Sequence, residues 1–322
     1  MVTIRLHRER HTATADRIDP SWLEEGSGVL VWVDLSAPTP EEGRLLTDVF
    51  HFHELAVEDA MAPVHHPKVE TYDGYFYLIV HGIDFQASQH QFATHDFDFF
   101  VGATYLVSVH DGQSRSIPEV AALCARNERM MAEGPAALLH RIVDTMVDHY
   151  SPEVEKLEDK LDDLERQVLD LRESRTMTRQ VLELKRDVAS LRLVILPQRD
   201  VLGRLARREF LHVSDDVAYR FRDVYDHVVR IADEALLFHD RITSILETHL
   251  SNVSNRLNEV MKVLTIISTI FMPLTVMTGM YGMNVPLVHF PGGESVQFWW
   301  IFGIMLSMSG VMLWFFRRHH WI

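Results

Sequence analysis

Two long stretches without a charged residue lie near the end of the chain, and they constrain its fold more than any other feature. They run from Val263 to Tyr281 and from Phe298 to Phe316. Each is long enough to cross about 30 Å of hydrocarbon as a helix. Because lipid tolerates only segments that satisfy their own backbone hydrogen bonds, the two stretches predict a hairpin of membrane helices joined by the loop 282–297.

The basic residues around these spans predict their orientation. Arg256 and Lys262 precede the first span, Arg317 and Arg318 follow the second, and the loop between the spans contains no lysine or arginine. Positively charged flanks favour the cytoplasmic side. We therefore expect a multi-pass protein of a bacterial-type inner or plasma membrane, with membrane lipids around it and both termini in the cytoplasm.

Composition narrows the possible partners. The chain has 322 residues and a formal net charge of −15, which argues against binding to nucleic acid. Its single cysteine, Cys124, excludes an intrachain disulfide and fits a reducing cytosol. The charged first residues predict no secretory signal.

Residues 1–134 predict a cytoplasmic α/β domain. Short runs rich in β-branched and aromatic residues predict strands at 2–7, 29–35, 76–83, 92–101 and 104–110, the last two joined as a hairpin at Gly102-Ala103. Thr39 and Pro40 have the character of an N-cap and a first helical residue. Helices are expected at 42–50, 53–61 and 117–131, and the strand order stays open.

Residues 135–213 predict an antiparallel helical hairpin, also cytoplasmic. Leucine and valine recur at heptad spacing at Leu157, Leu161, Leu164, Val168 and Leu171. A second long helix is expected to run back through Leu182, Leu184, Val188 and Leu191. A turn is expected near 173–176, and Pro197 is a possible kink.

Residues 214–262 predict a stalk helix that continues into the first span, since neither glycine nor proline occurs between Gly203 and Pro273. Its apolar seam is Val217, Phe221, Val224, Val228, Ile231, Ala235, Phe238, Ile242 and Ile245. The seam slips by one residue and resumes as Leu246, Leu250, Val253, Leu257, Val260 and Leu264. A helix over 215–281 would be about 100 Å long. It cannot cover this seam alone, so we expect identical stalks around a symmetry axis.

One face of the first span mixes small, hydroxyl and thioether side chains. Its members are Asn258, Met261, Leu264 or Thr265, Ser268, Met272, Thr275 and Gly279. Spacing alone leaves helix packing and pore lining equally open. Because the spans contain no ionisable residue, a passive gated pore is favoured over a proton-coupled carrier.

The run from Asn258 to Asn284, which ends in YGMN, resembles the first membrane helix and signature of CorA-type magnesium and cobalt transporters. The second span and the basic tail extend the resemblance, as do Val57-Glu58-Asp59, Pro67-Lys68-Val69-Glu70 and the segment 221–227. The α+β fold that this resemblance implies is a cytoplasmic α/β domain, long stalk helices and a two-helix transmembrane domain (263–322). The implied assembly is a funnel-shaped homopentamer.

The resemblance also implies a function, which is a gated divalent-cation channel and not an enzyme. The transported ion is chiefly Mg²⁺, with Co²⁺ or Ni²⁺ as passengers, and no other small-molecule substrate is expected. Gly282, Met283 and Asn284 would form the selectivity filter, in which a ring of amide oxygens accepts hydrogen bonds from hydrated Mg²⁺. Met261, Leu264 and Met272 match hydrophobic constrictions, and Thr275 and Gly279 match polar pore positions. From the residues alone, Gly-Met-Asn also fits an ordinary helix C-cap.

A regulatory role for Mg²⁺ is implied by the same resemblance. Asp59 of one subunit would face Asp223 of the next across a bound ion that holds the channel closed. Glu58 and Asp148 are weaker candidates for a second ion, with solvated helix surface as the alternative.

The outer loop departs from the usual pattern. Pro291-Gly292-Gly293, with Glu294 as the only acid, resembles loops of the zinc-transporting ZntB branch. A Zn²⁺ transporter, possibly proton-coupled, is therefore the alternative. His51, His53, His65 and His66 could bind Zn²⁺ or Ni²⁺, although surface or domain-contact histidines are the more common outcome.

Overall fold

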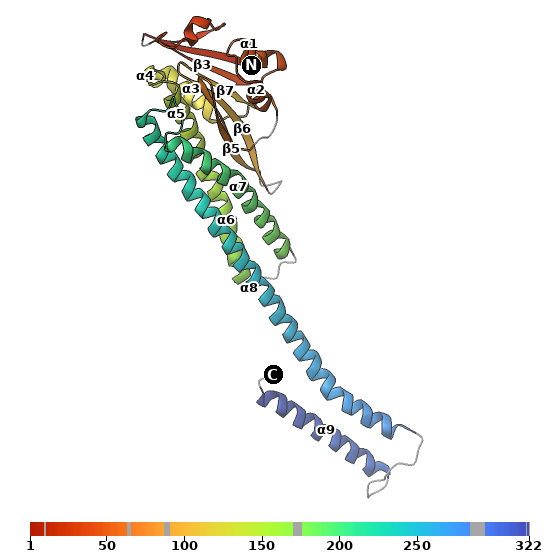
Figure 1. Cartoon of the computed structure of the whole chain (residues 1–322). Helices are drawn as coiled ribbons and strands as arrows, with labels where there is room; N and C mark the ends of the chain where they lie inside the picture. The colour runs from red at the N-terminus through yellow and green to blue at the C-terminus, as the bar shows by residue number, and fades with distance from the viewer. Residues whose placement is uncertain are drawn as a thin grey trace. The chain divides into compact units, whose positions relative to one another are not determined.

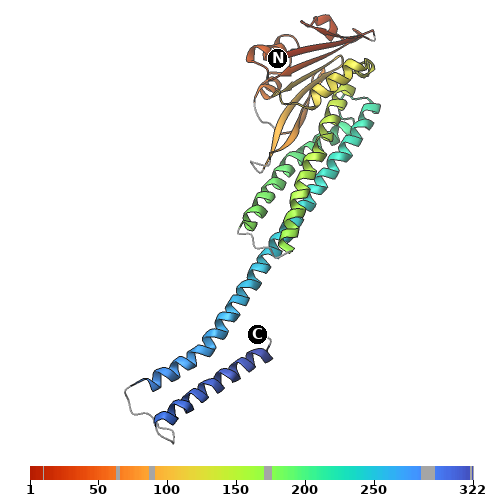
Figure 2. The same ribbon diagram turned by 180° about the vertical axis from the view of Figure 1, so that it is seen from behind.

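A computed structural model describes residues 1–9, 11–62, 66–86, 91–169, 176–283, 294–319 and 321, and the side chains of these residues except 84–86, 91, 92, 169, 294 and 295 (Figures 1 and 2). Contacts between Cα atoms divide the chain into two compact units, Met1–Leu246 and Glu247–Ile322. The finer division at 134, 213 and 262 stays a prediction.

The first unit contains a seven-stranded sheet with the order β2-β1-β3-β7-β6-β5-β4. Neighbouring strands are antiparallel except β3 and β7, which pair in parallel. The strands are β1 (Val2–Arg8), β2 (His11–Ala15), β3 (Val29–Ser36), β4 (Lys68–Tyr72), β5 (Tyr75–Gln86), β6 (Gln91–Gly102) and β7 (Tyr105–His110). The five expected strands and the β6–β7 hairpin are confirmed, whereas β2 and β4 were not expected.

The described helices follow the expected positions with one break. They are η1 (Pro20–Leu23), α1 (Pro40–Asp48), α2 (Glu54–Met61), α3 (Ser116–Arg126), α4 (Arg129–Ala132), α5 (Pro135–Asp148), α6 (Tyr150–Leu169), α7 (Met177–Ala206), α8 (Asp215–Tyr281) and α9 (Glu294–Arg318). The expected helix over 117–131 is divided, because Asn127 has an extended backbone between α3 and α4. Helix α7 continues through Pro197.

The start of α1 is the cap that the sequence predicts. The Thr39 hydroxyl accepts a hydrogen bond from the Glu42 amide at 3.3 Å, and the Glu42 carboxylate accepts one from the Thr39 amide at 2.9 Å. This reciprocal pair satisfies two backbone donors that the helix leaves free.

Successive residues of each strand point to opposite faces, so the sheet has two separate cores. On β3, Val31 and Val33 belong to the core that includes Ala56 and Ala60 of α2. Leu30 and Trp32 belong to the core on the other face, which includes α5, α6, α7 and the first part of α8. Both views show α6, α7 and this part of α8 side by side (Figures 1 and 2).

The apolar seam of α8 is buried from Val217 to Ile245 at every position that the sequence predicts. The α6 seam is buried at four predicted positions, and the fifth, Leu171, lies outside the described residues, as do most of the turn residues expected near 173–176. On α7 the prediction is wrong at Leu182, which is 48% exposed. Val181 takes the buried position there, because the seam runs at spacings of four and three from Met177 through Val181 to Leu184.

A buried side-chain amide ties α7 to the sheet. β5 continues beyond the end of β4, so the backbone of His81 has no neighbouring strand on that edge. The side-chain amide of Gln198 makes the hydrogen bonds that a neighbouring strand would make. Its oxygen accepts from the His81 amide at 2.7 Å, and its nitrogen donates to the His81 carbonyl at 3.2 Å. Tyr150 of α6 donates to the same carbonyl and accepts from Gln198. These bonds remove the cost of an unpaired buried strand edge.

Candidate functional site

Helix α8 runs without interruption from Asp215 through the first predicted span to Tyr281. α8 and α9 are the two described helices that are long and apolar enough to cross a membrane. No residue in the apolar window of either helix is buried inside the chain. Within the described residues, neither apolar window is packed into a core, as expected of segments covered by lipid or by other copies of the chain.

The predicted pore stripe is exposed along its whole length in the single chain. Met261, Leu264 and Met272 are 58%, 54% and 70% exposed, and Asn258, Ser268, Thr275 and Gly279 belong to the same exposed class. Apolar residues on other faces, such as Phe271 and Val276, are also exposed. Exposure in one chain thus does not separate a pore face from a lipid face, and the pore-lining role stays a prediction.

Two threonines in this segment direct their hydroxyl protons back to their own helix. Thr275 donates to the carbonyl of Phe271 at 2.8 Å, and Thr265 donates to the carbonyl of Met261 at 2.7 Å. A hydroxyl oxygen that donates its proton still has lone pairs to accept hydrogen bonds. Each threonine oxygen therefore keeps the capacity to accept a hydrogen bond.

The predicted filter begins where α8 ends. Gly282 donates its amide to the carbonyl of Thr278 at 2.9 Å, and a Cβ at this position would lie 3.0 Å from that oxygen. Gly282 does not have a positive φ, so it is not a left-handed C-cap. The close approach to Thr278 is the reason for a glycine here. Met283 is 60% exposed, and Asn284 lies outside the described residues.

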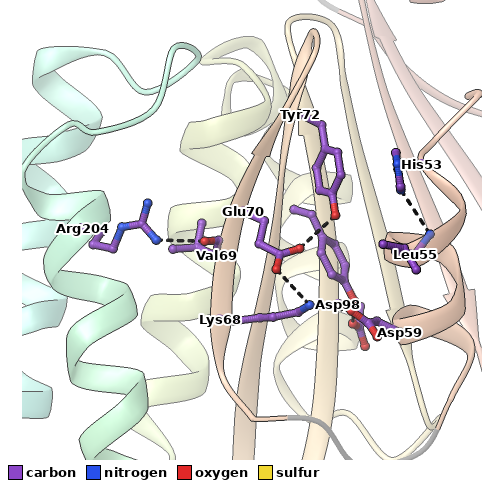
Figure 3. A network of polar contacts seen from close by, with 10 residues as sticks. His53, Leu55, Asp59, Lys68, Val69, Glu70, Tyr72, Asp98 and Arg204 are labelled. Carbon is purple, nitrogen blue, oxygen red and sulfur yellow. Dashed lines mark hydrogen bonds and ion pairs between the residues drawn. The ribbon is translucent and has the colours of Figure 1, made fainter.

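The predicted sensor residue Asp59 lies on α2 and forms an ion pair with a lysine from β4. Lys68 Nζ is 2.5 Å from Asp59 Oδ2 and 3.2 Å from Glu70 Oε1, and Tyr72 donates to Glu70 at 2.9 Å (Figure 3). Burial lowers the pKa of Lys68, but its hydrogen bonds to Asp59 and Glu70 outweigh this, so the pKa is raised and the amine stays charged.

A second carboxyl group lies behind Asp59. Asp98 of β6 is 4% exposed and accepts a hydrogen bond from the Tyr77 hydroxyl. Burial raises the pKa of Asp98 to about 8, although the Tyr77 hydrogen bond acts in the opposite direction. The charges of Asp96 and Asp59 contribute to this raised pKa, and the charge of Lys68 opposes it. Asp98 is therefore largely protonated at neutral pH.

Asp148 and Asp223 lie in a different place, where both are close enough to Asp144 to affect its charge and where His140 of α5 packs against Phe221 of α8. Both carboxylates act electrostatically on Asp144, whose pKa is raised by burial first and then by these two negative charges. His140 and His227 act on Asp144 in the opposite sense. Asp144, His140 and His227 were not among the site residues predicted from the sequence. The spacing of four between 140, 144 and 148, and between 223 and 227, was the available signal.

The sheet separates the two groups of predicted sensor residues within one chain. Glu58 and Asp59 are on α2, which packs on one face of the sheet, whereas Asp148 and Asp223 are on helices that pack on the other face. Glu58, Asp148 and Asp223 are exposed. One chain therefore does not bring Asp59 to Asp223, and an ion between them would require a second copy.

Two of the histidines near Asp59, His51 and His53, make local hydrogen-bonding contacts. The His53 side chain accepts from the Leu55 amide at 3.2 Å as the N-cap of α2, and His51 Nδ1 lies 3.0 Å from the Thr47 carbonyl oxygen. His66 is exposed, and His65 lies outside the described residues. Within the described part of the chain, no three histidine, cysteine or acidic side chains are grouped as metal ligands.

Comparison with known proteins identifies the family. The model of the family "CorA-like Mg2+ transporter protein" matches residues 27–318. The chain is 32% identical over 297 residues to "Putative metal ion transporter YfjQ" of Bacillus subtilis, covering 89% of this chain and 88% of that one. It is also 32% identical over 308 residues to "Cobalt/magnesium transport protein CorA" of Thermotoga maritima, covering 91% and 86% of the two chains.

A solved structure supports the same fold. The CorA magnesium transporter from Methanocaldococcus jannaschii matches with a TM-score of 0.84 at 22% identity, over 100% of this chain and 99% of that one. Together with the family match, this confirms the resemblance found in the YGMN signature and the predicted sequence of α/β domain, long helices and membrane helices. The chain belongs to the CorA-like Mg2+ transporter family.

Proposed function

We propose that this protein is a gated divalent-cation channel of the plasma membrane, chiefly for Mg²⁺ and also for Co²⁺ or Ni²⁺. One observation carries the proposal: α8 extends as a single helix from the buried core of the first unit to the residue that precedes the filter tripeptide. A continuous helix can couple a cytoplasmic event to the pore that it lines. The names of the relatives, which include cobalt and magnesium transport, support the choice of ions.

The ion pathway in this proposal is lined by the face of α8 that contains Asn258, Ser268, Thr275 and Gly279. Met261, Leu264 and Met272 would form narrow apolar rings that close the path when they lose water. The Thr275 hydroxyl already donates to its own helix, so its oxygen is available to accept a hydrogen bond from a water of the hydrated ion.

The filter in this proposal is a ring of Asn284 side chains held by Gly282 and Met283. Mg²⁺ gives up its water reluctantly. A neutral amide oxygen can accept hydrogen bonds from these waters without displacing them, and so it can select a hydrated ion by size and by donor geometry.

Regulation in this proposal depends on contacts between copies of the chain. Asp59 of one subunit would share a Mg²⁺ with Asp223 of the next, and Glu58 and Asp148 would contribute to a second ion. The sheet lies between these groups in one chain, which supports a site between subunits. When cytosolic Mg²⁺ falls, the ions leave, the like charges repel, and the closed arrangement loses its stabilisation.

The assembly in this proposal is a homopentamer with both termini in the cytoplasm. The exposed apolar residues of α8 beyond Ile245 support an assembly in which several α8 helices cover one another. The divisions at 134, 213 and 262 would then separate the α/β domain, the helical hairpin, the stalk and the pore domain. No catalytic step is part of the function.

Flux through proteoliposomes tests the proposal. The purified full chain is reconstituted with a Mg²⁺-sensitive dye inside the vesicles, and influx is measured for the wild type and for Asn284→Ala. We expect Asn284→Ala to lose most of the Mg²⁺ influx or its selectivity, while Asn255→Ala, a matched change on exposed α8, retains it. Equal influx in the wild type and in Asn284→Ala would contradict the filter.

Zinc transport is the second candidate, and the Pro291-Gly292-Gly293 loop with its single acid favours it. Neither span contains an acidic, basic or histidine side chain, which argues against proton coupling. Uptake of Mg²⁺, Co²⁺, Ni²⁺ and Zn²⁺ in competition, with and without a pH gradient, separates the two candidates. Zn²⁺ influx that exceeds Mg²⁺ influx and follows the pH gradient would favour the zinc transporter.

A further inference from the structure

Lys68 forms an ion pair with Asp59, the carboxylate that the proposed function assigns to the regulatory ion. Its ammonium group is 2.5 Å from Asp59 Oδ2 and 3.2 Å from Glu70 Oε1. It also lies 5.7 Å from the centre of the Tyr77 ring, at cation–π range. Figure 3 shows the Lys68 side chain between the two acids. A single positive charge thus bridges two carboxylates of the same chain.

The surroundings of this bridge are open to solvent ions. Asp59, Lys68, Glu70, Leu55, Thr71 and Tyr72 line a cleft of about 540 Å³. The side chains of Lys68, Asp59 and Glu70 are 34%, 24% and 42% exposed. A hydrated divalent cation can therefore reach Asp59, but the Asp59 carboxylate is already paired with the Lys68 ammonium group.

The geometry of the lysine suits a replaceable cation. β4 pairs with β5 at Lys68 and Ile79, so the backbone of Lys68 is fixed while its four-carbon side chain can turn. If Lys68 leaves Asp59, Glu70 remains within reach as a second partner. The charge need not become unpaired when another cation takes its place.

We propose that Lys68 is a tethered competitor of the regulatory divalent cation: it neutralises Asp59 when the site is empty and must move toward Glu70 for the ion to bind. This inference rests on the proposed sensor role of Asp59. Lys68 thereby sets the Mg²⁺ concentration at which the channel closes, since every ion that binds must first break the Lys68–Asp59 pair. Without the lysine the site would respond to lower concentrations.

The test is Mg²⁺-dependent thermal stabilisation of the purified full chain in detergent, measured as the Mg²⁺ concentration that gives half of the maximal shift. Lys68→Met keeps most of the apolar stem and removes the charge. Because the pair is partly exposed, we expect this concentration to fall roughly three- to tenfold. Lys68→Arg, which keeps the charge, should leave it unchanged or raise it. Lys156→Met, which removes a lysine–carboxylate pair with Glu153 at 2.7 Å on α6, away from Asp59, should leave it unchanged.

The same titration separates this inference from the proposed function. If Asp59→Asn abolishes the Mg²⁺ shift and Lys68→Met leaves the half-maximal concentration unchanged or raises it, Lys68 is no competitor, while the sensor stands. If Asp59→Asn responds to Mg²⁺ like the wild type, the sensor assignment fails, and the role of Lys68 fails with it. Unfolding without Mg²⁺ reports whether Lys68→Met is folded. If it is not, Lys68→Gln takes its place, with the same expected direction.

Discussion

The apolar seam of α8 is covered by the chain's own helices as far as Ile245 and is uncovered from Leu250 onward. Phe221 and Val228 are fully buried against α5, α6 and α7, whereas Leu250 and Leu257 are 57% and 61% exposed. The spacing of four and three residues is the same in both parts, with a slip of one residue between Ile245 and Leu246. Sequence periodicity therefore indicates that a face needs a partner, but it does not tell whether that partner belongs to the same chain.

The difference between the covered and uncovered parts of α8 also predicts that the two units are stabilised in different ways. The unit Met1–Leu246 completes its own cores on both faces of the sheet, so its unfolding should be a property of one chain. The unit Glu247–Ile322 exposes its apolar side chains, so its stability should depend on lipid and on other copies. The following substitutions test this division, in order of decreasing effect on the first unit.

Phe221→Ala should have the largest effect, because it removes a fully buried ring from the covered part of the seam. We expect the free energy of unfolding of the first unit to fall by about 3–5 kcal/mol. Amide hydrogen exchange in β3 and β7 of the full chain, which reports the opening of this unit, measures it. A loss below about 1 kcal/mol would mean that Phe221 is not a core residue.

Asp98→Asn should change how the stability of the first unit depends on pH. The pKa of Asp98 is raised to about 8 in the folded chain, against about 3.9 when unfolded. Between these values the folded state binds more protons than the unfolded state, so the wild type loses stability as pH rises from 4 to 8. The expected slope is about 1 kcal/mol per pH unit between pH 5 and 7.

The difference in unfolding free energy between the wild type and Asp98→Asn, measured at pH 5, 6, 7 and 9, isolates this contribution. The asparagine of Asp98→Asn does not titrate. As pH rises to about 8, the unfolding free energy of the wild type should therefore fall relative to that of Asp98→Asn, and above pH 8 the difference should stay constant. A difference that stays constant from pH 5 to 9 would show that Asp98 is ionised throughout.

Arg241→Met should have a smaller effect on the last turns of the covered part. Arg241 of α8 forms ion pairs with Asp162 at 2.6 Å and Glu165 at 2.5 Å, both on α6. Its side chain is 34% exposed, so we expect a loss of roughly 0.5–1 kcal/mol that shrinks in high salt. The control Arg166→Met removes a pair in which both side chains are about 70% exposed, and it should change stability less.

Leu250→Ala should have the smallest effect on the first unit, at most about 0.5 kcal/mol, because the Leu250 side chain is 57% exposed. The same substitution should weaken the oligomer, which native mass spectrometry of the full chain at increasing detergent concentration would detect. If Leu250→Ala destabilises the first unit as much as Phe221→Ala, the division at residue 246 is wrong.

Periodic features could be predicted from the sequence, and pairings between distant segments could not. The α8 seam follows from spacing, and the continuity of α8 into the first span follows from the absence of glycine and proline between Gly203 and Pro273. β2 and β4 were missed because they are short, and β2 is mostly exposed without apolar alternation. The parallel pairing of β3 with β7 brings together Val31 and Tyr105, which no local pattern connects.

In the candidate site, too, contacts between distant segments could not be predicted from the sequence. The family resemblance selected Asp59 and Asp223, but only the fold shows that the sheet lies between them. Lys68 was part of a matching segment, Pro67-Lys68-Val69-Glu70, without a role, because its partner Asp59 comes from another element. Asp98 was missed because its burial, and hence its raised pKa, depends on the packing of the sheet.

The Gln198 amide has a mechanical consequence. It makes a helix side chain part of the backbone ladder of β5, and Tyr150 adds a second helix to the same point. Any sliding of α7 along the sheet would have to break several buried bonds at once, without water to replace them. The sheet, α6 and α7 should therefore respond to an applied load as one rigid block, with the strain appearing where such cross-links end.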